Sequence, residues 1–122
     1  MGIPKTLLSK STIRGDTSMI FVTVGNHSLH FDRLIKKADE LASKGKINNV
    51  FIQTGCSKYK PVACKFEAFI DQDRFNKMIS MAEVVIAHAG AGTIMTCLRY
   101  NKVPVVVPRR KKFGEHTNDH QL

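Results

Sequence analysis

Short apolar runs alternate with stretches in which apolar residues recur at helical spacing, from Met19 to near the end of the chain. Short runs bounded by glycine, proline or polar residues are typical of buried strands, whereas apolar residues three or four positions apart are typical of helices. The runs predict strands at residues 20–24, 50–54, 64–70, 84–87 and 103–107. The stretches between them predict helices at residues 31–44, 73–81 and 90–100, with a further helix starting near Asn118.

The helix expected at residues 31–44 has the clearest pattern. Its apolar residues fall on one face, and Gly45 follows as a helix-ending residue. That face is formed by Leu34, Ile35, Ala38, Leu41 and Ala42. Strands that alternate with helices indicate βαβ units. We therefore predict an α/β fold with a Rossmann-like parallel sheet of about five strands and helices on both faces.

Ligands of such sheets bind beyond the carboxyl ends of the strands. Three loops follow strands and are expected at that edge, at residues 25–28, 88–93 and 109–121. The sequence thus predicts one binding edge built from three segments that are distant in the chain.

The chain divides into an N-terminal tail, residues 1–18, and one domain, residues 19–122. The tail is rich in Ser and Thr and shows no period, and we expect it to be disordered or non-native. A single domain of this size is too small for an enzyme with a cleft between two domains. Either the function is simple binding, or a second chain completes the site.

The net charge of +9 favours anionic partners, namely nucleotides, phosphates, anionic lipid surfaces or nucleic acid. The alternative is that the charge serves solubility alone. A nucleic-acid binder is the least favoured class, because the chain has no Trp and no nucleic-acid motif. Three cysteines without a Cys-x-x-Cys pair are typical of a reducing compartment, which favours the cytoplasm.

The glycine-rich turn at residues 88–93, His-Ala-Gly-Ala-Gly-Thr, joins an apolar strand to a helix. Glycines allow the backbone to approach a ligand closely, and the N–H groups at a helix start suit a pyrophosphate. The alternative is a tight turn whose glycines serve packing, since the spacing matches neither the dinucleotide fingerprint nor the P-loop.

Four consecutive cations, residues 109–112, follow the last predicted strand. Arginine holds phosphate oxygens with two donors, and the Asn, Gln and carboxylate side chains that follow suit sugar hydroxyls. The alternative is a solvated charged loop, which its place at the predicted binding edge disfavours. The spacing of Glu115, His116, Asp119 and His120 matches no zinc site, so we predict no metal and no cofactor.

Taken together and in order, these motifs resemble the C-terminal, donor-binding domain of family 28 glycosyltransferases. The resemblance covers residues 19–122 and rests on Phe-Val-Thr-Val-Gly at 21–25, the turn at 88–93, Val-Pro-Arg at 107–109 and Asn-Asp-His-Gln at 118–121. It is greatest to small split subunits, both the bacterial polysaccharide subunits of the PssE type and the cytosolic subunit of the dolichol-linked N-acetylglucosaminyltransferase.

The resemblance implies one half of a GT-B fold that binds a UDP-sugar. Gly25 and Asn26 would lie near the diphosphate, the turn would hold the diphosphate and ribose, and the His-Gln pair would face the donor sugar. The candidate substrate-binding residues are Gly25, Asn26, His88, Gly90, Ala91, Gly92, Thr93, Arg109, Glu115, His116, Asn118, His120 and Gln121.

The implied activity is inverting transfer of a sugar from a UDP-sugar to a polyprenyl-diphosphate-linked acceptor. A membrane-anchored partner subunit would supply the acceptor site and the general base, and would hold this chain at the cytoplasmic face of the membrane. The alternative is a non-catalytic nucleotide-binding or regulatory module. It is motivated by two departures: Thr96 stands where relatives often carry a ribose-binding Glu, and the sequence ends at Leu122 where relatives continue with a helix.

Overall fold

The computed structural model describes residues 19–25 and 28–116. The expected tail, Asn26, the helix near Asn118 and the candidate residues Asn118, His120 and Gln121 lie outside these ranges. The strands are β1 (Ile20–Thr23), β2 (Val50–Gln53), β3 (Lys65–Glu67), β4 (Val84–His88) and β5 (Val105–Val107). The helices are α2 (Asp32–Ser43), α3 (Gln72–Met81), α4 (Ala91–Arg99) and the short 3-10 helix η2 (Lys111–Phe113).

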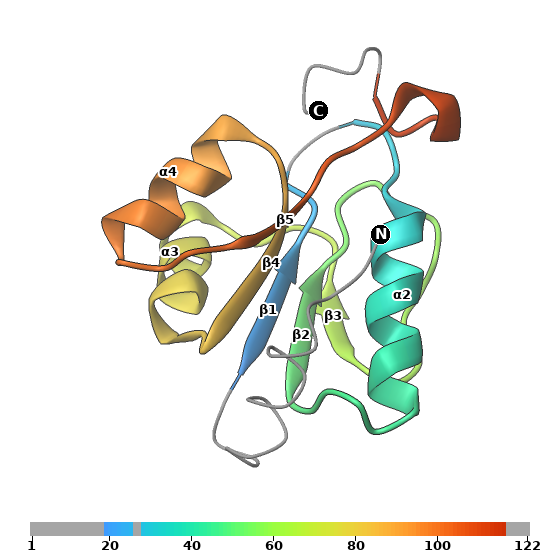
Figure 1. Cartoon of the computed structure of the whole chain (residues 1–122), viewed down its shortest axis with the longest axis horizontal. Coiled ribbons are helices and arrows are strands. Elements are labelled where there is room, and N and C mark those ends of the chain that lie inside the picture. Colours follow the sequence, from blue (N-terminus) through green and yellow to red (C-terminus); the bar gives the residue numbers. More distant parts are fainter. Residues whose placement is uncertain (1–18, 26–27, 117–122) are drawn as a thin grey trace.

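The five strands form one parallel sheet in the order β3-β2-β1-β4-β5. Helix α2 covers one face of the sheet, and α3 and α4 cover the other (Figure 1). The predicted α/β fold, with a parallel sheet of five strands and helices on both faces, is confirmed. Among the described residues, no helix combines the length and apolarity that crossing a bilayer requires.

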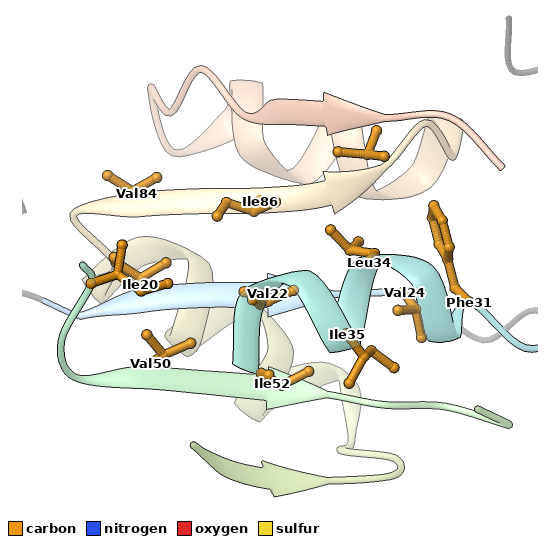
Figure 2. Packing of buried hydrophobic residues seen from close by; sticks show 13 residues of the cluster. Ile20, Val22, Val24, Phe31, Leu34, Ile35, Val50, Ile52, Val84 and Ile86 are labelled. Carbon is orange, nitrogen blue, oxygen red and sulfur yellow. The ribbon is translucent and has the colours of Figure 1, made fainter. Parts of the chain in front are cut away.

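Alternate residues of the central strands supply two hydrophobic cores, one on each face of the sheet. In β1, Ile20 and Val22 point to the α2 side, whereas Phe21 points to the side of α3 and α4. Figure 2 shows the α2 side, where Leu34 and Ile35 pack over the strands. All five of these side chains are at most 1% exposed. Burial on both faces explains why β1 and β4 are apolar up to their last residues, Thr23 and His88.

Two predicted strands are shorter than expected by two residues or more, for local reasons. The strand expected at 64–70 is limited to residues 65–67. Successive carbonyls of a strand point to opposite sides, but those of Glu67 and Ala68 both point to the same neighbour, accepting from the amides of Thr54 and Gly55 at 2.9 and 2.8 Å, so the strand ends there. The strand expected at 103–107 begins only at Val105. Pro104 has no N–H group for a strand ladder, and Val103 is 89% exposed.

Two carboxylates of α2 hold the loop that leads from β2 to β3. Asp32 accepts hydrogen bonds from the amides of Lys58 and Tyr59, both at 2.9 Å. Two turns further along the same side, Asp39 accepts from the Tyr59 hydroxyl at 2.5 Å and from the amides of Val62 and Ala63. The loop is thereby fixed against a helix rather than left to the solvent.

Candidate nucleotide-binding site

The strand order reverses between β1 and β4, the two strands at the centre of the sheet. From β1 the chain proceeds outwards to β2 and β3, and it then returns to the other side of β1 to form β4 and β5. In open parallel sheets, this switch point at the carboxyl ends of the strands is where ligands bind. Gly25 follows β1 and His88 ends β4, so both lie at this point.

A cavity of about 590 Å³ opens at the switch point, on the side of α3 and α4. It brings together four predicted site residues from two separate loops, which are Gly25, His88, Gly92 and Thr93. Its wall also contains Thr96, which stands at the ribose position that the resemblance implies, and four residues that the sequence did not single out, namely Gln53, Ile70, Gln72 and Phe75. The cavity therefore combines a polar floor with an apolar wall from the start of α3, as is common in ligand sites.

The ring of His88 fills the space between the two glycine turns. A Cβ atom on Gly25 would lie 2.4 Å from His88 Nε2, and one on Gly90 would lie 2.0 Å from His88 Cε1. Gly25 also has a φ of +72°, which side chains rarely adopt. The imidazole is buried, and its Nε2 lies 3.1 Å from the hydroxyl oxygen of Thr93. Both turns thus pack on one histidine, which explains the two glycines without reference to a ligand.

Gln53, at the end of β2, fixes the backbone of Gly25 in two directions. Its Oε1 accepts from the Gly25 amide at 3.1 Å, and its Nε2 donates to the Gly25 carbonyl at 3.1 Å. The same Nε2 donates to the carbonyl of Ala68 at 2.7 Å, and the Thr23 hydroxyl donates to Oε1 at 2.6 Å. The side chain is 2% exposed, so these bonds hold the first turn rigidly at the floor of the cavity.

Helix α4 begins at the second turn, with Gly90 as its N-cap residue in an extended conformation. The N–H groups of a first helical turn have no partner within the helix, and they carry the positive end of the helix dipole. Ala91 and Gly92 are exposed there, so this end of α4 is accessible to an anion. Thr96 lies one turn further on, and its hydroxyl donates to the Gly92 carbonyl at 3.0 Å.

Arg109 was predicted to hold a phosphate, and the structure gives it a different set of contacts. Its side chain is completely buried. Nη2 donates to the carbonyl of Val24 at 2.7 Å, and Nη1 donates at 3.0 Å to the carbonyls of Leu29, His30 and Glu115. Burial lowers the pKa of the guanidinium to about 10, an effect that the Glu115 carboxylate opposes. Arg109 therefore faces protein backbone rather than the cavity.

Glu115 was predicted to contact a sugar, but it too is completely buried. Its carboxylate accepts from Arg33 Nε and Nη2 at 3.1 and 2.9 Å, and from the amide of Arg110 at 3.0 Å. A carboxylate that is buried and paired in this way belongs to the structural framework. His116, the next candidate, is half-buried at the end of this segment.

The predicted cationic run is divided by the fold. Arg109 is buried, whereas Lys111 and Lys112 are exposed on η2, which lies beside the N-terminal end of α2 (Figure 1). Within residues 19–25 and 28–116, no three His, Cys, Asp or Glu side chains are grouped as a metal site would need. The N-terminal end of α4, which contributes Gly92 and Thr93 to the cavity, therefore supplies positive potential there without any of the predicted cations.

Of the unpredicted wall residues, Gln53 is the one that left a signal in the sequence. It is an amide at the end of the apolar run Val-Phe-Ile-Gln, directly before the polar loop. A polar residue at the carboxyl end of a buried strand is a candidate for the ligand edge. Ile70 and Phe75 left no such signal, because apolar residues beside a helix start are indistinguishable from core.

Comparisons with known proteins agree with this architecture. Residues 19–122 match the model of the glycosyltransferase family 28 C-terminal domain. The chain is 35% identical over 107 residues to the human UDP-N-acetylglucosamine transferase subunit ALG13, a match that covers 80% of this chain and 9% of the human protein. The mouse protein of the same name is 33% identical over 107 residues, a match that covers 79% of this chain and 9% of the mouse protein.

Two further matches are more limited. The Candida albicans ALG13 subunit is 32% identical over 62 residues, which are 51% of this chain and 21% of that protein. A solved structure described as the glycotransferase of kitacinnamycin has a TM-score of 0.61 and 18% identity, over 79% of this chain and 26% of that one. At this identity the likeness concerns the fold alone. The chain belongs to the family of the glycosyltransferase family 28 C-terminal domain.

Proposed function

We propose that this chain is the donor-binding subunit of a glycosyltransferase and that the cavity at the β1–β4 switch point receives a UDP-sugar. The supporting observation is the convergence of Gly25, His88 and the start of α4 on one cavity. Membership of the family supports the donor-binding role. The human and mouse relatives are named UDP-N-acetylglucosamine transferase subunits, which supports UDP-N-acetylglucosamine as the first donor to test.

The chemistry expected of such a site is stabilisation of a leaving diphosphate. Cleavage of the bond between sugar and phosphate leaves negative charge on UDP, and donors already in place stabilise that charge without reorganising. The first turn of α4 offers N–H groups and a positive dipole end. The Thr93 hydroxyl lines the same cavity and lies 3.1 Å from Nε2 of the buried His88, so it is free to donate to a ligand when His88 Nε2 carries the proton.

The remaining parts of the reaction are assigned to a partner. The chain spans about 9% of the length of the human and mouse relatives, and those relatives are named as subunits. We propose that a membrane-anchored second chain brings a polyprenyl-diphosphate-linked acceptor and the general base, and closes the cavity from water. The proposed reaction is therefore inverting transfer of a sugar in polysaccharide or oligosaccharide synthesis. We propose that it takes place at the cytoplasmic face of the membrane.

A non-catalytic nucleotide-binding module is the second candidate. It is favoured by Thr96, a neutral hydroxyl in the cavity wall at the position where the resemblance implies a carboxylate that accepts from the ribose hydroxyls. Both candidates predict UDP binding. They differ in whether sugar is transferred once the partner is added.

The direct test is a thermal shift titration of the full chain with UDP, UDP-sugars and, as a control, inorganic phosphate. A ligand of the folded state raises Tm by mass action, by an amount equivalent to about 2.7 kcal/mol at a hundred times Kd. A rise with UDP that exceeds the rise with phosphate supports the proposal. Equal shifts, or none at millimolar UDP, would refute a nucleotide site.

A further inference from the structure

Arg109 connects two segments that meet behind the cavity. One is the turn between β1 and α2, which begins with Val24 and Gly25. The other is the segment of residues 108–116, which follows β5. Nη2 reaches the carbonyl of Val24, and Nη1 reaches those of Leu29 and His30, so the guanidinium contacts both ends of the turn. Its fourth acceptor, the carbonyl of Glu115, belongs to its own segment.

This arrangement depends on the shape of an arginine side chain. The planar guanidinium presents several donors in a fixed fork, whereas the ammonium of lysine is a compact point charge. Arg109 also lies over the ring of Phe31, 4.8 Å from its centroid, at the point where α2 begins. Figure 2 shows Val24 and Phe31 at the carboxyl end of the sheet. A lysine at position 109 would lose both the fork and the stacking.

The second segment is itself held in place. Glu115 binds Arg33 of α2 with two hydrogen bonds, and Arg33 Nη2 also donates to the Pro108 carbonyl at 3.0 Å. The Arg33 guanidinium lies 4.9 Å from the ring centroid of Phe113. The segment is therefore held on α2 at both of its ends, through Pro108 and Glu115. Because Arg109 belongs to this segment, its hydrogen bonds also hold the turn before α2 in place.

We propose that Arg109 is a positioning residue for the cavity: it fixes the turn that carries Gly25 to the segment of residues 108–116, so that the two move as one unit. The inference rests on the proposed function in one respect, namely that the ligand of the cavity is UDP. It also predicts that a ligand or partner bound to the segment after β5 changes the geometry of the Gly25 turn.

The first test needs no ligand. Hydrogen exchange followed by mass spectrometry is measured on the full chain and on its Arg109→Lys and Arg109→Met variants. Peptides that cover residues 24–31 should exchange at least about tenfold faster in Arg109→Met, because the variant loses three charge-assisted hydrogen bonds to this turn and the loss of one alone corresponds to about that factor. Peptides from α3 should be unchanged. Unchanged exchange in residues 24–31 overturns the proposal.

The second test is UDP affinity, with Val50→Ala as the control. Val50 is a core residue at the amino end of β2, at the opposite edge of the sheet from the cavity. At an equal loss of Tm, Arg109→Lys should bind UDP about tenfold more weakly than the wild type, and Val50→Ala within about twofold of it. Equal affinity of the Arg109→Lys and Val50→Ala variants overturns the positioning role.

A third variant covers the case in which the Arg109 variants do not fold. Glu115→Gln keeps the size of the side chain but removes the charge that anchors Arg33, and it should accelerate exchange in residues 24–31 in the same direction. No acceleration overturns the proposal. Absence of UDP binding by the wild type refutes the nucleotide assignment alone, because the exchange measurements decide the positioning role by themselves.

Discussion

A methyl group on Gly25 would lie 2.4 Å from Nε2 of His88, so the first glycine turn exists only because its glycine leaves room for the histidine at the end of β4. The two residues are distant in the chain, and they meet because β1 and β4 are neighbours in the sheet. The close packing of this pair makes the floor of the cavity sensitive to small substitutions.

Gly25→Ala should destabilise the fold by more than Gly45→Ala. Both glycines have a φ of +72°, which costs an L-residue about 1–2 kcal/mol. Nothing lies within 4 Å of a Cβ on Gly45, whereas a Cβ on Gly25 would clash with the His88 ring at 2.4 Å. Chemical denaturation of both variants separates the cost of the backbone from that of the clash. Equal losses would show that His88 moves aside freely.

Gly90→Ala and Gly92→Ala form a second pair, within one turn. A Cβ on Gly90 would meet His88 at 2.0 Å, whereas nothing lies within 4 Å of a Cβ on Gly92. We expect Gly90→Ala to cost about 1–3 kcal/mol by overpacking. Gly92→Ala, inside α4, should be neutral or stabilise by up to about 1 kcal/mol. Thermal and urea unfolding measure both, and a reversed order would contradict the described geometry.

Gln53→Glu should lower stability by about 2–3 kcal/mol at neutral pH. The substitution removes the donors to the carbonyls of Gly25 and Ala68 and places a charge beside them. Because the protonated form restores one donor, the pKa of the new carboxyl is expected to rise, and the lost stability should return as pH falls. Gln72→Glu, at the exposed start of α3, is the matched control. A pH-independent loss would contradict this role of Gln53.

Asp39 should contribute stability that is lost in acid. Burial alone would raise its pKa, but the hydrogen bonds from Tyr59, Val62 and Ala63 outweigh that effect and hold the pKa below its ordinary value of 3.8. A carboxyl whose pKa is lowered by folding stabilises the fold above its unfolded-state pKa and ceases to do so as pH falls through its folded-state pKa. Asp39→Asn should therefore cost about 2 kcal/mol at pH 7.

The same substitution should make progressively less difference as pH falls through the lowered folded-state pKa of Asp39, because the wild-type carboxyl then becomes protonated as well. Urea unfolding between pH 2 and pH 7 measures this convergence. Glu40→Gln, on the exposed side of the same helix, should change the pH profile much less, because Lys44 and Lys37, which lower the pKa of Glu40, are exposed and their effect is screened by solvent. Persistence of the full difference between Asp39→Asn and the wild type in acid would show that the carboxylate charge is not responsible.

Much of the fold was predictable, because burial on both faces makes each central strand a predominantly apolar run. The strand order was not predictable in the same way, since register and neighbours depend on contacts between distant residues. Within the site, the turn at 88–93 was identified by its glycines. The burial of Arg109 was not foreseen, because a run of four cations indicates exposure, whereas the carbonyls that this side chain binds belong to a loop about 80 positions earlier.

The most direct test of the nucleotide assignment is an NMR titration of the ¹⁵N-labelled chain with UDP. The account predicts that the largest amide shift changes occur at Gly25, His88, Gly92 and Thr93, which line the cavity, and that Gly45, which follows the C-terminal end of α2, does not respond. Changes confined to the exposed lysines of η2, or distributed evenly over the surface, would contradict a nucleotide site at the β1–β4 switch point.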